Sequence, residues 1–477
     1  MRRSLLVLVV LALGAALAPA GAAAKPQAGV RPDPSFGNGL GFVTLEFSGV
    51  DTIANAAIAT SDGIVVAGDA FPKNSTGQVL VAKYDSTGNL DPSFGTQGIF
   101  ISSLPQADGP FGANAVAQDT QGRFLVAGGY GQDSVLVLRL TATGQLDTTF
   151  GTGGLTTIPL GDAAESIALQ KDGRILVGSS NRGENGRPMV VARLTSSGAV
   201  DPSFGTNGKT ELLFWDPNLA NSVGVTSLAT TPNGRIVGSS HLDNIGGGPS
   251  SAGVFRLTSS GHLDPGYGNG GVVRVLFPNP DGSFAPWFQC AMTLDPSGRA
   301  TVTGDASTDT AGVILTARLT ATGALDPSFG PGGDGRVAIP GTNGDAVTCG
   351  AAASGGVFTL GVGSSFAQLL QDGTPNENFA AGGVTNIGTP ADLGINAVVL
   401  PRPHVAVLAG AAGTSLYVSR WLLPPSRGAG HALPPPNKLP ENAGPGPIGG
   451  VSTARHSSAS NATPRATSVP PTPTRAA

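Results

Sequence analysis

Charged residues are scarce in this sequence of 477 residues, and their scarcity excludes several kinds of fold. They make up 12 % of the chain, whereas about 25 % is usual for soluble domains. Lysine is almost absent. Long solvated helices, whose outer faces carry Glu and Lys, are therefore not expected. Beyond the N-terminal segment no apolar run reaches the roughly 18 residues of a membrane-spanning helix, so we expect no membrane span.

Glycine and proline are abundant instead. The chain contains 72 Gly and 38 Pro, about 15 % and 8 % of its residues against usual shares of about 7 % and 5 %. A chain so rich in turn-forming residues favours an all-β fold of many short strands.

The two ends of the sequence differ in composition from its middle. Two arginines precede the apolar run Leu5 to Leu13 and a stretch of small residues, the pattern of a Sec-type bacterial signal peptide over residues 1–24. Residues 25–32 form a short linker. Residues 424–477 contain 12 Pro and no apolar periodicity, so we predict a disordered tail. The mature protein is predicted to be secreted and extracellular.

The charge balance of the middle segment excludes one class of partner. Residues 25–423 contain 20 basic and 30 acidic residues, a net charge of −10. Binding to nucleic acid needs a positive stripe, so we expect no nucleic-acid partner.

A short motif, Asp-Pro-Ser-Phe-Gly in its commonest form, recurs through the middle segment. Successive copies begin 50 to 63 residues apart. The copies begin at Asp33, Asp91, Asp147, Asp201, Asp264, Asp326 and, in degraded form, Asn376. The spaces between them each contain four short strand-like runs and a Gly turn. The predicted units are 33–90, 91–146, 147–200, 201–263, 264–325, 326–375 and 376–423.

Seven units of four strands predict a seven-bladed β-propeller, because β-helix repeats are shorter. The last unit has no motif after it, whereas Asp33 to Gly37 has no strand before it. We therefore expect the first motif to dock against the last blade and complete the ring.

A basic residue precedes each outgoing turn at a fixed distance. These residues are Lys83, Arg139, Arg193, Arg256, Arg318 and Arg420. In the sixth unit, the neutral Gln368 replaces the basic residue and the neutral Asn376 replaces the motif Asp. Their joint replacement is expected if the two side chains form a pair. We predict that each base contacts the Asp that follows its own strand, which leaves Arg420 for Asp33. The alternative is that the two sets are independent surface charges.

The aromatic residue of the motif is predicted to be buried as a wedge between neighbouring blades, whose faces are rich in Ala, Val and Gly. The seven positions are Phe36, Phe94, Phe150, Phe204, Tyr267, Phe329 and Phe379.

These motifs resemble the delta-60 repeat family of exported bacterial proteins, whose units end in Leu-Asp-Pro-Ser-Phe-Gly. The resemblance covers residues 33 to about 422, and the seventh copy departs from it. It implies a propeller-like fold and an exported location but no chemistry.

Few residues offer chemistry. Cys290 and Cys349 fall in second strands of neighbouring units, and in an exported chain they are predicted to form a disulfide; the alternative is two buried free thiols. His241 is expected in a loop, and the few histidines lack metal-ligand spacing. We therefore predict no catalytic residue, no metal site and no cofactor.

The loops at the end of the ring opposite the motifs vary in length and composition. Trp215 and Trp287 fall in equivalent long loops of adjacent units, and Phe288 directly follows Trp287. A further long loop is expected from His241 to Ser251. Aromatic residues on variable loops favour a ligand site, although the tryptophans could instead only pin their own loops. The predicted function is a secreted, monomeric, non-enzymatic scaffold that binds an extracellular glycan, a peptide or an envelope component. The alternative is an exported lyase or hydrolase that works at the axial channel.

Overall fold

The computed structural model describes residues 29–73, 77–102, 111–131, 133–161, 163–180, 189–212, 221–243, 250–278, 288–308, 311–340, 349–354, 357–362, 365–387, 393–402 and 404–424. The predicted signal peptide and all but the first residue of the predicted tail lie outside these ranges. The described residues form strands and one short 3-10 helix, Ala381–Gly383. None of the helical structure in these ranges is long and apolar enough to cross a membrane.

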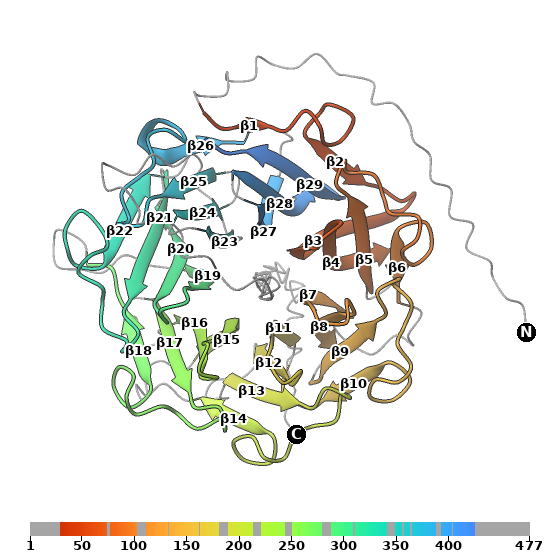
Figure 1. The fold of residues 1–477 in the computed structure, drawn as a ribbon, viewed down its shortest axis with the longest axis horizontal. Helices are drawn as coiled ribbons and strands as arrows, with labels where there is room; N and C mark the ends of the chain where they lie inside the picture. The colour runs from red at the N-terminus through yellow and green to blue at the C-terminus, as the bar shows by residue number, and fades with distance from the viewer. Residues whose placement is uncertain are drawn as a thin grey trace, which may run out of the picture.

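The strands form seven antiparallel sheets arranged around a common centre, which we number sheet 1 to sheet 7 in the order of their inner strands (Figure 1). The inner strands are β3 (Val50–Ala59), β7 (Phe111–Gln118), β11 (Ala163–Leu169), β15 (Asn221–Thr230), β19 (Phe288–Leu294), β23 (Cys349–Ser354) and β27 (Leu393–Arg402). The second strands are β4 (Gly63–Pro72), β8 (Phe124–Tyr130), β12 (Ile175–Ser180), β16 (Ile236–Asp243), β20 (Ala300–Thr308), β24 (Val357–Val362) and β28 (Val405–Ala412). The third strands are β5 (Gln78–Asp85), β9 (Val135–Leu140), β13 (Met189–Leu194), β17 (Ser251–Leu257), β21 (Ala311–Leu319), β25 (Ser365–Leu369) and β29 (Ser415–Leu422). The outer strands are β6 (Ile99–Ile101), β10 (Leu155–Ile158), β14 (Lys209–Leu212), β18 (Val272–Val275), β22 (Arg336–Pro340), β26 (Val384–Asn386) and β2 (Phe42–Leu45).

Sheet 7 differs from the prediction of seven uniform four-stranded blades. The structure shows six four-stranded sheets among the described residues, whereas sheet 7 has five strands because β1 (Arg31–Pro32) and β2 both pair with β29. The pairing of β1 has a counterpart in sheet 2. In β1, Pro32 pairs with Trp421 of the last third strand. In sheet 2, Leu146 pairs in the same way with Leu140 of the third strand, but only as an isolated bridge. Both Pro32 and Leu146 directly precede the Asp of a motif.

The outer strand of each sheet comes from the sequence unit that follows the other three strands. The run Phe42–Leu45 follows the first motif, yet it pairs with β29 near the end of the chain. A segment from the N-terminal end thus completes the sheet formed by the C-terminal strands, and the backbone N–H of Asp33 donates to the carbonyl of Arg420 at 2.8 Å. This arrangement confirms that the first motif docks against the last sheet.

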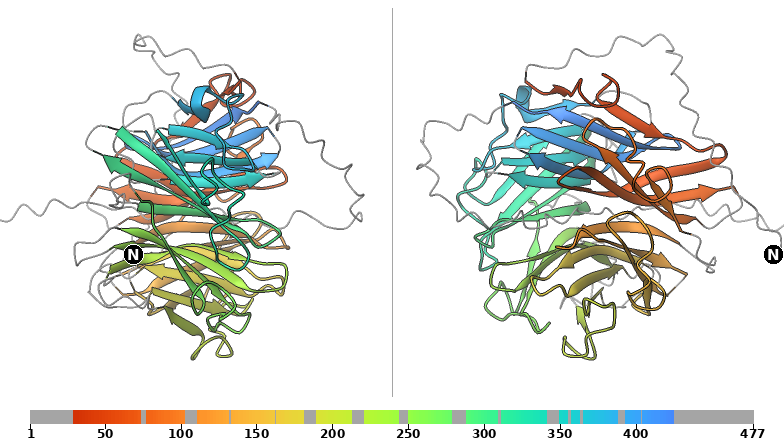
Figure 2. Two further views of the ribbon diagram at one scale, coloured as in Figure 1. Left: turned by 90° about the vertical axis from the view of Figure 1, so that its left-hand side faces the viewer. Right: turned by 45° about the vertical axis from the view of Figure 1, so that its right-hand side comes forward.

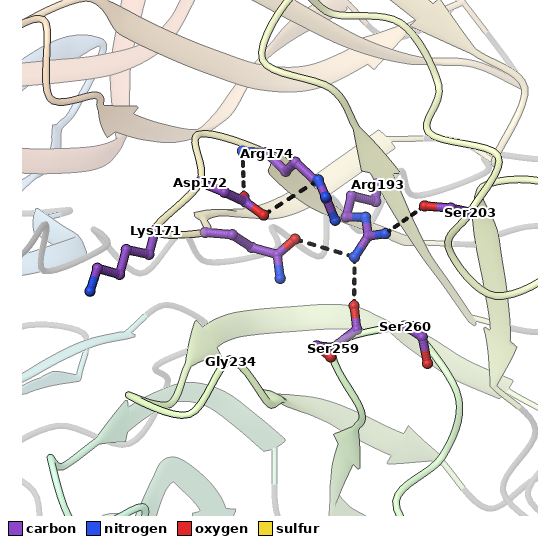
Figure 3. Close-up of a pocket in the computed structure, with 9 residues that line it drawn as sticks. Lys171, Asp172, Arg174, Arg193, Ser203, Gly234, Ser259 and Ser260 are labelled. Atoms are coloured by element: carbon purple, nitrogen blue, oxygen red, sulfur yellow. Dashed lines mark hydrogen bonds and ion pairs between the residues drawn. The ribbon is translucent and has the colours of Figure 1, made fainter.

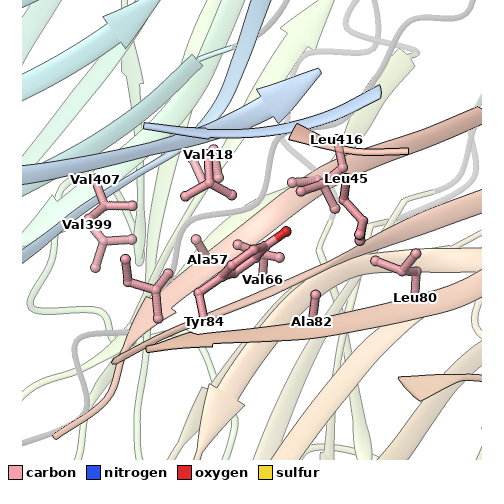
Figure 4. Packing of buried hydrophobic residues seen from close by; sticks show 14 of the residues in the cluster. Leu45, Ala57, Val66, Leu80, Ala82, Tyr84, Val399, Val407, Leu416 and Val418 are labelled. Carbon is pink, nitrogen blue, oxygen red and sulfur yellow. The ribbon is translucent and has the colours of Figure 1, made fainter. Parts of the chain in front are cut away.

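The apolar core is divided among the junctions between neighbouring sheets. Each of seven clusters of buried residues contains one motif aromatic, and each draws its members from two adjacent sheets. All seven of these aromatic side chains are fully buried. Figure 4 shows the junction of sheets 7 and 1, where Val407 and Val418 face Val66 and Tyr84. The predicted role of the aromatics as wedges between sheets is confirmed.

The inner strands are also joined side by side by polar side chains. Six of the inner strands have a β-bulge at equivalent positions. The bulged residues are Asn55, Asn114, Glu165, Thr226, Cys290 and Asn396. The Nδ2 atoms of Asn55, Asn114 and Asn396 donate to backbone carbonyls of the next inner strand, at 2.9, 3.0 and 2.7 Å. The bond from Asn396 reaches Ala54 and therefore crosses the closure of the ring.

The strands run between two opposite ends of the ring, as the edge-on view in Figure 2 shows. Because neighbouring strands are antiparallel, the turns between inner and second strands lie at the same end as the motifs. We call this the motif end. The connections between second and third strands, and those from each outer strand to the next inner strand, lie at the opposite end, which we call the loop end.

Candidate functional site

The motif end is organised around one basic side chain in each of six third strands. Arg193 of β13 is 2 % exposed. Its Nε donates to Asp201 Oδ2 at 2.9 Å, and its Nη2 donates to Ser203 Oγ at 3.1 Å. Its Nη1 donates to the carbonyl of Ser259 in the neighbouring sheet 4 at 2.6 Å. The guanidinium also lies over the Phe204 ring, with 4.6 Å between Cζ and the ring centroid.

The same pairing recurs around the ring. The nitrogen–oxygen distances are 2.9 Å for Lys83–Asp91, 2.8 Å for Arg139–Asp147, 2.9 Å for Arg193–Asp201, 2.9 Å for Arg256–Asp264, 2.7 Å for Arg318–Asp326 and 2.8 Å for Arg420–Asp33. The five arginines each bond a carbonyl of the next sheet, those of Ser196, Ser259, Ala321, Gln371 and Ser86. The predicted contacts between each base and its Asp are therefore confirmed, and they also tie adjacent sheets together.

Hydrogen bonds and charge fix the ionisation of these groups. The Ser203 hydroxyl donates to Asp201 and, with the charge of Arg193, lowers the pKa of the Asp201 carboxyl, although burial acts in the opposite direction. The pKa of Asp91 falls to about 2 because Ser93 and Lys83 donate to its carboxylate. Burial lowers the pKa of Arg193, and the nearby charge of Arg174 adds to this shift.

Sheet 6 carries the neutral version of the pair. Asn376 Nδ2 donates to Gln368 Oε1 at 2.5 Å, and both side chains are buried. In five other sheets the arginine also bonds the turn that follows the third strand of the next sheet. After sheet 6 that third strand is β29, which no motif follows. The residue after β29 that corresponds to these acceptors is Leu423, which is buried and does not belong to a motif turn.

A second arginine, which the sequence analysis did not single out, supports the motif Asp from the turn between inner and second strands. The residues are Arg123, Arg174, Arg235 and Arg299, each directly after the turn glycine. Their nitrogens lie 3.8, 3.7, 2.6 and 3.7 Å from the carboxylate of the motif Asp in their own sheet. The recurring Gly-Arg pair was the sequence signal that would have found them.

A pocket of about 560 Å³ lies at the motif end between sheets 3 and 4 (Figure 3). One wall is formed by the turn between β11 and β12, with Gln170, Lys171 and Arg174, and by Arg193. The turn is held by its own backbone, since the N–H of Gln170 donates to the carbonyl of Arg174 at 2.9 Å. Ser203 of the motif completes this wall.

The facing wall belongs to sheet 4 and consists of Gly234, Ser259 and Ser260. Figure 3 shows the Ser259 carbonyl meeting the Arg193 guanidinium across the junction. The close approach of the sheets depends on a glycine: Gly261 has a φ of +92°, and a Cβ there would lie 2.8 Å from the Phe204 ring. All nine lining residues are polar or glycine, and seven of them carry an ionisable or hydroxyl group.

Of the four predicted ligand-binding residues, the structure describes Phe288 and His241. Trp215 and Trp287 lie outside the described residues, in the connections that lead to β15 and β19. Phe288 is the first residue of β19. The expectation that His241 lies in a loop was wrong, because β16 extends to Asp243 and His241 pairs with Ala252 of β17. His241 is 3 % exposed.

The cysteines lie in inner strands of neighbouring sheets. Cys290 is the bulged residue of β19, and Cys349 begins β23. The two strands are in contact, so the backbone arrangement is compatible with the predicted disulfide, which stays a prediction. Within the described ranges, no three His, Cys, Asp or Glu side chains are grouped as metal ligands would be.

Comparison with protein families bears on the repeats. Residues 60–94, 122–150, 170–204 and 296–329 match the family described as "Domain of unknown function (DUF5122) beta-propeller". The chain contains β-propeller repeats. Each matched segment runs from the turn after the inner strand to the motif aromatic, and so includes a basic residue, its Asp and the wedge. No sequence among the curated proteins matches the chain.

The chain is similar to several solved structures at low identity and with TM-scores below 0.5. A polysaccharide lyase, the PL25 ulvan lyase, is 11 % identical, with 80 % of this chain and 96 % of the lyase covered and a TM-score of 0.40. Drosophila Semaphorin 2a is 9 % identical, with 77 % and 74 % covered and a TM-score of 0.46. The GH93 α-L-arabinofuranosidase of Fusarium graminearum is 10 % identical, with 67 % and 96 % covered and a TM-score of 0.37.

Proposed function

We propose that this chain is a secreted, seven-bladed β-propeller of the delta-60 repeat type that acts as a monomeric, non-enzymatic binding scaffold. In this proposal sheet 7 serves as the closing blade. The partner is an extracellular glycan, a peptide or an envelope component, and it binds at the loop end.

The observation that carries the proposal is the contrast between the two ends. At the motif end, the connections from third to outer strands are nearly constant in length, from 13 residues between Asp85 and Ile99 to 16 between Leu319 and Arg336. At the loop end, the connections from outer strands to the next inner strands range from four residues, between Leu45 and Val50, to twelve, between Val275 and Phe288. Segments of variable length on a constant framework are the usual way in which proteins build binding sites.

The aromatic candidates favour one part of the loop end. Trp215 and Trp287 belong to connections that end at β15 and β19, the inner strands of neighbouring sheets that are in contact. Phe288 continues the second connection into its strand. Tryptophan is enriched among the residues that dominate binding energy, so we place the contact at this pair of connections.

Array binding tests the proposal. Wild type, Trp215→Ala and Trp287→Ala are applied to glycan and peptide arrays beside Leu40→Ala, a control at the motif end where Leu40 is 57 % exposed. We expect one class of spot to bind wild type and the control, with a loss of about tenfold or more in either tryptophan variant. Equal binding by all four proteins would remove the proposed surface. Release of glycan fragments during incubation would favour the lyase or hydrolase alternative.

A further inference from the structure

The pocket between sheets 3 and 4 lacks a carboxylate that equivalent turns elsewhere in the ring possess. In sheet 2 the first turn residue is Asp119, which accepts from Arg123 Nε at 2.7 Å. In sheet 5 it is Asp295, which accepts from Arg299 Nε at 2.7 Å. The backbone bonds of these turns match those of the sheet 3 turn, where the residue is the neutral Gln170.

Without this carboxylate, Arg174 has only longer ion pairs than Arg123 and Arg299 have. Its Nε lies 3.4 Å from Asp172 Oδ2 and 3.7 Å from Asp201 Oδ2, and its guanidinium donates no hydrogen bond to a described residue. The side chain is 43 % exposed, compared with 28 % for Arg123 in sheet 2. In sheet 4, where Thr231 replaces the Asp, Arg235 instead closes onto Asp264 at 2.6 Å.

A further positive charge stands beside this arginine. Lys171 occupies the position of Thr120 in sheet 2, is exposed, and forms no ion pair with any residue that the structure describes. The pocket wall therefore has three basic groups, Lys171, Arg174 and Arg193, against two acidic ones, Asp172 and Asp201. The matching groups of sheets 2 and 5 are balanced. A local positive excess in a chain of net negative charge indicates an anionic ligand.

We propose that this pocket binds the oxyanion of an acidic oligosaccharide, a carboxylate or a sulfate, in the place that Asp119 and Asp295 occupy in the equivalent turns. Arg174 offers its unused N–H donors in a fork suited to a carboxylate or sulfate, and Lys171 adds a point charge. The site is at the motif end and is separate from the loop-end surface proposed above.

The size and lining of the pocket favour a sugar as the carrier of the anion. A volume of about 560 Å³ falls within the roughly 300–1,000 Å³ of small-ligand sites and far exceeds the need of a lone ion. The hydroxyl of Ser259 donates to no described residue and faces the pocket beside Ser260. No apolar side chain lines the pocket, so it offers little to the side chains of a peptide.

Calorimetric titration of the full chain tests the proposal. The probes are trigalacturonate, its neutral methyl ester, a sulfated galactan trisaccharide and tri-glutamate. We expect trigalacturonate, the sulfated sugar or both to bind with one site per chain, more weakly at 0.5 M salt, where the screening length is only about 4 Å. Equal binding of the methyl ester, tighter binding of tri-glutamate, or no binding of either acidic sugar would overturn the proposal.

Variants that exchange residues between equivalent positions of the repeats provide a second test of the pocket. Gln170→Asp restores the internal carboxylate, so it should leave the melting temperature unchanged or higher and weaken acidic-sugar binding by about tenfold or more, equivalent to about 1.4 kcal/mol. Lys171→Ala should weaken binding, whereas Lys209→Ala, which removes a similarly exposed lysine from β14, should not. The double variant Asp119→Gln, Thr120→Lys should raise the stoichiometry from one to two. Unchanged binding in Gln170→Asp and unchanged stoichiometry in the double variant would both contradict the proposal, and neither result bears on the tryptophan surface.

Discussion

Arg420 Nε lies 2.8 Å from the carboxylate of Asp33, although 387 positions separate the two residues in the sequence. Both side chains are buried, and Arg420 also bonds the carbonyl of Ser86 and lies over the Phe36 ring. The pair therefore joins the first motif to the last third strand, and through Ser86 it joins sheet 7 to sheet 1.

Removal of Arg420 should weaken the closure of the ring. Arg420→Leu leaves the buried Asp33 carboxylate without its charged partner, so we expect a loss of about 3 to 5 kcal/mol in the free energy of unfolding. Denaturant titration measures it. The control is Lys209→Ala, which breaks the half-exposed pair with Glu211 and should cost at most about 1 kcal/mol. A similar small cost for both variants would show that the pair does not hold the ring closed.

The neutral pair in sheet 6 offers a reciprocal test. Gln368→Arg alone buries a cation beside an amide, and Asn376→Asp alone buries an anion, so each should destabilise the protein. The double variant restores the charge pair found in the other sheets. Its destabilisation should be smaller than the sum of the single effects by about 0.5 to 3 kcal/mol, as expected for residues in contact.

A double-variant cycle in denaturant provides this coupling energy. Additive effects would contradict the direct pairing of positions 368 and 376.

The sequence predicted the ring closure because two independent patterns agreed: the incomplete first and last units, and the joint loss of charge at Gln368 and Asn376. It could not show that the strand after each motif pairs with the preceding sheet, since strand patterns do not specify partners. Hairpin spacing alone is equally compatible with either grouping.

Other features escaped prediction for local reasons. His241 was expected in a loop, yet antiparallel pairing with β15 and β17 satisfies the backbone of this segment and extends β16 to Asp243. The positive charge of the pocket was missed because it depends on two side chains, Gln170 in place of Asp and the neighbouring Lys171, in a turn whose backbone is unchanged. Such a site becomes visible only when equivalent side chains are compared in space.

The protein should become more stable when Tyr267 loses its hydroxyl. It replaces the Phe of the other motifs and is fully buried, and among the described residues its OH has no hydrogen-bond partner. Burial also raises the pKa of this phenol. An unsatisfied buried polar group costs about 1 to 3 kcal/mol. Tyr267→Phe removes this cost and should therefore raise the free energy of unfolding by about that amount. Phe204→Ala, which empties the equivalent wedge, should lower it by about 3 to 5 kcal/mol. A destabilised Tyr267→Phe would indicate a partner for the hydroxyl.

Acid should unfold the ring through the motif carboxylates. The pKa of Asp91 is lowered from 3.8 to about 2 in the folded state, and those of Asp33, Asp147, Asp201, Asp264 and Asp326 are also lowered. The unfolded chain therefore binds more protons at low pH, and stability present above about pH 4 is lost as the pH falls toward 2. Melting temperatures measured from pH 6 to pH 2 should fall in this window. Asp91→Asn should reduce the slope, and a flat profile would contradict the assignment.

The last prediction concerns the redox state of the two cysteines. Cys290 and Cys349 lie in contacting inner strands of sheets 5 and 6. The secretion proposed above would take the chain through an oxidising compartment, where disulfides form. We expect denatured protein without reductant to show no free thiol. A bridge here would close a loop of about 60 residues, so reduction or Cys290→Ser should cost about 2 to 4 kcal/mol. Ala291→Ser, a neighbouring change in the same strand, separates this effect from local damage to β19. Two titratable thiols in the denatured, unreduced protein would establish the alternative of two free cysteines.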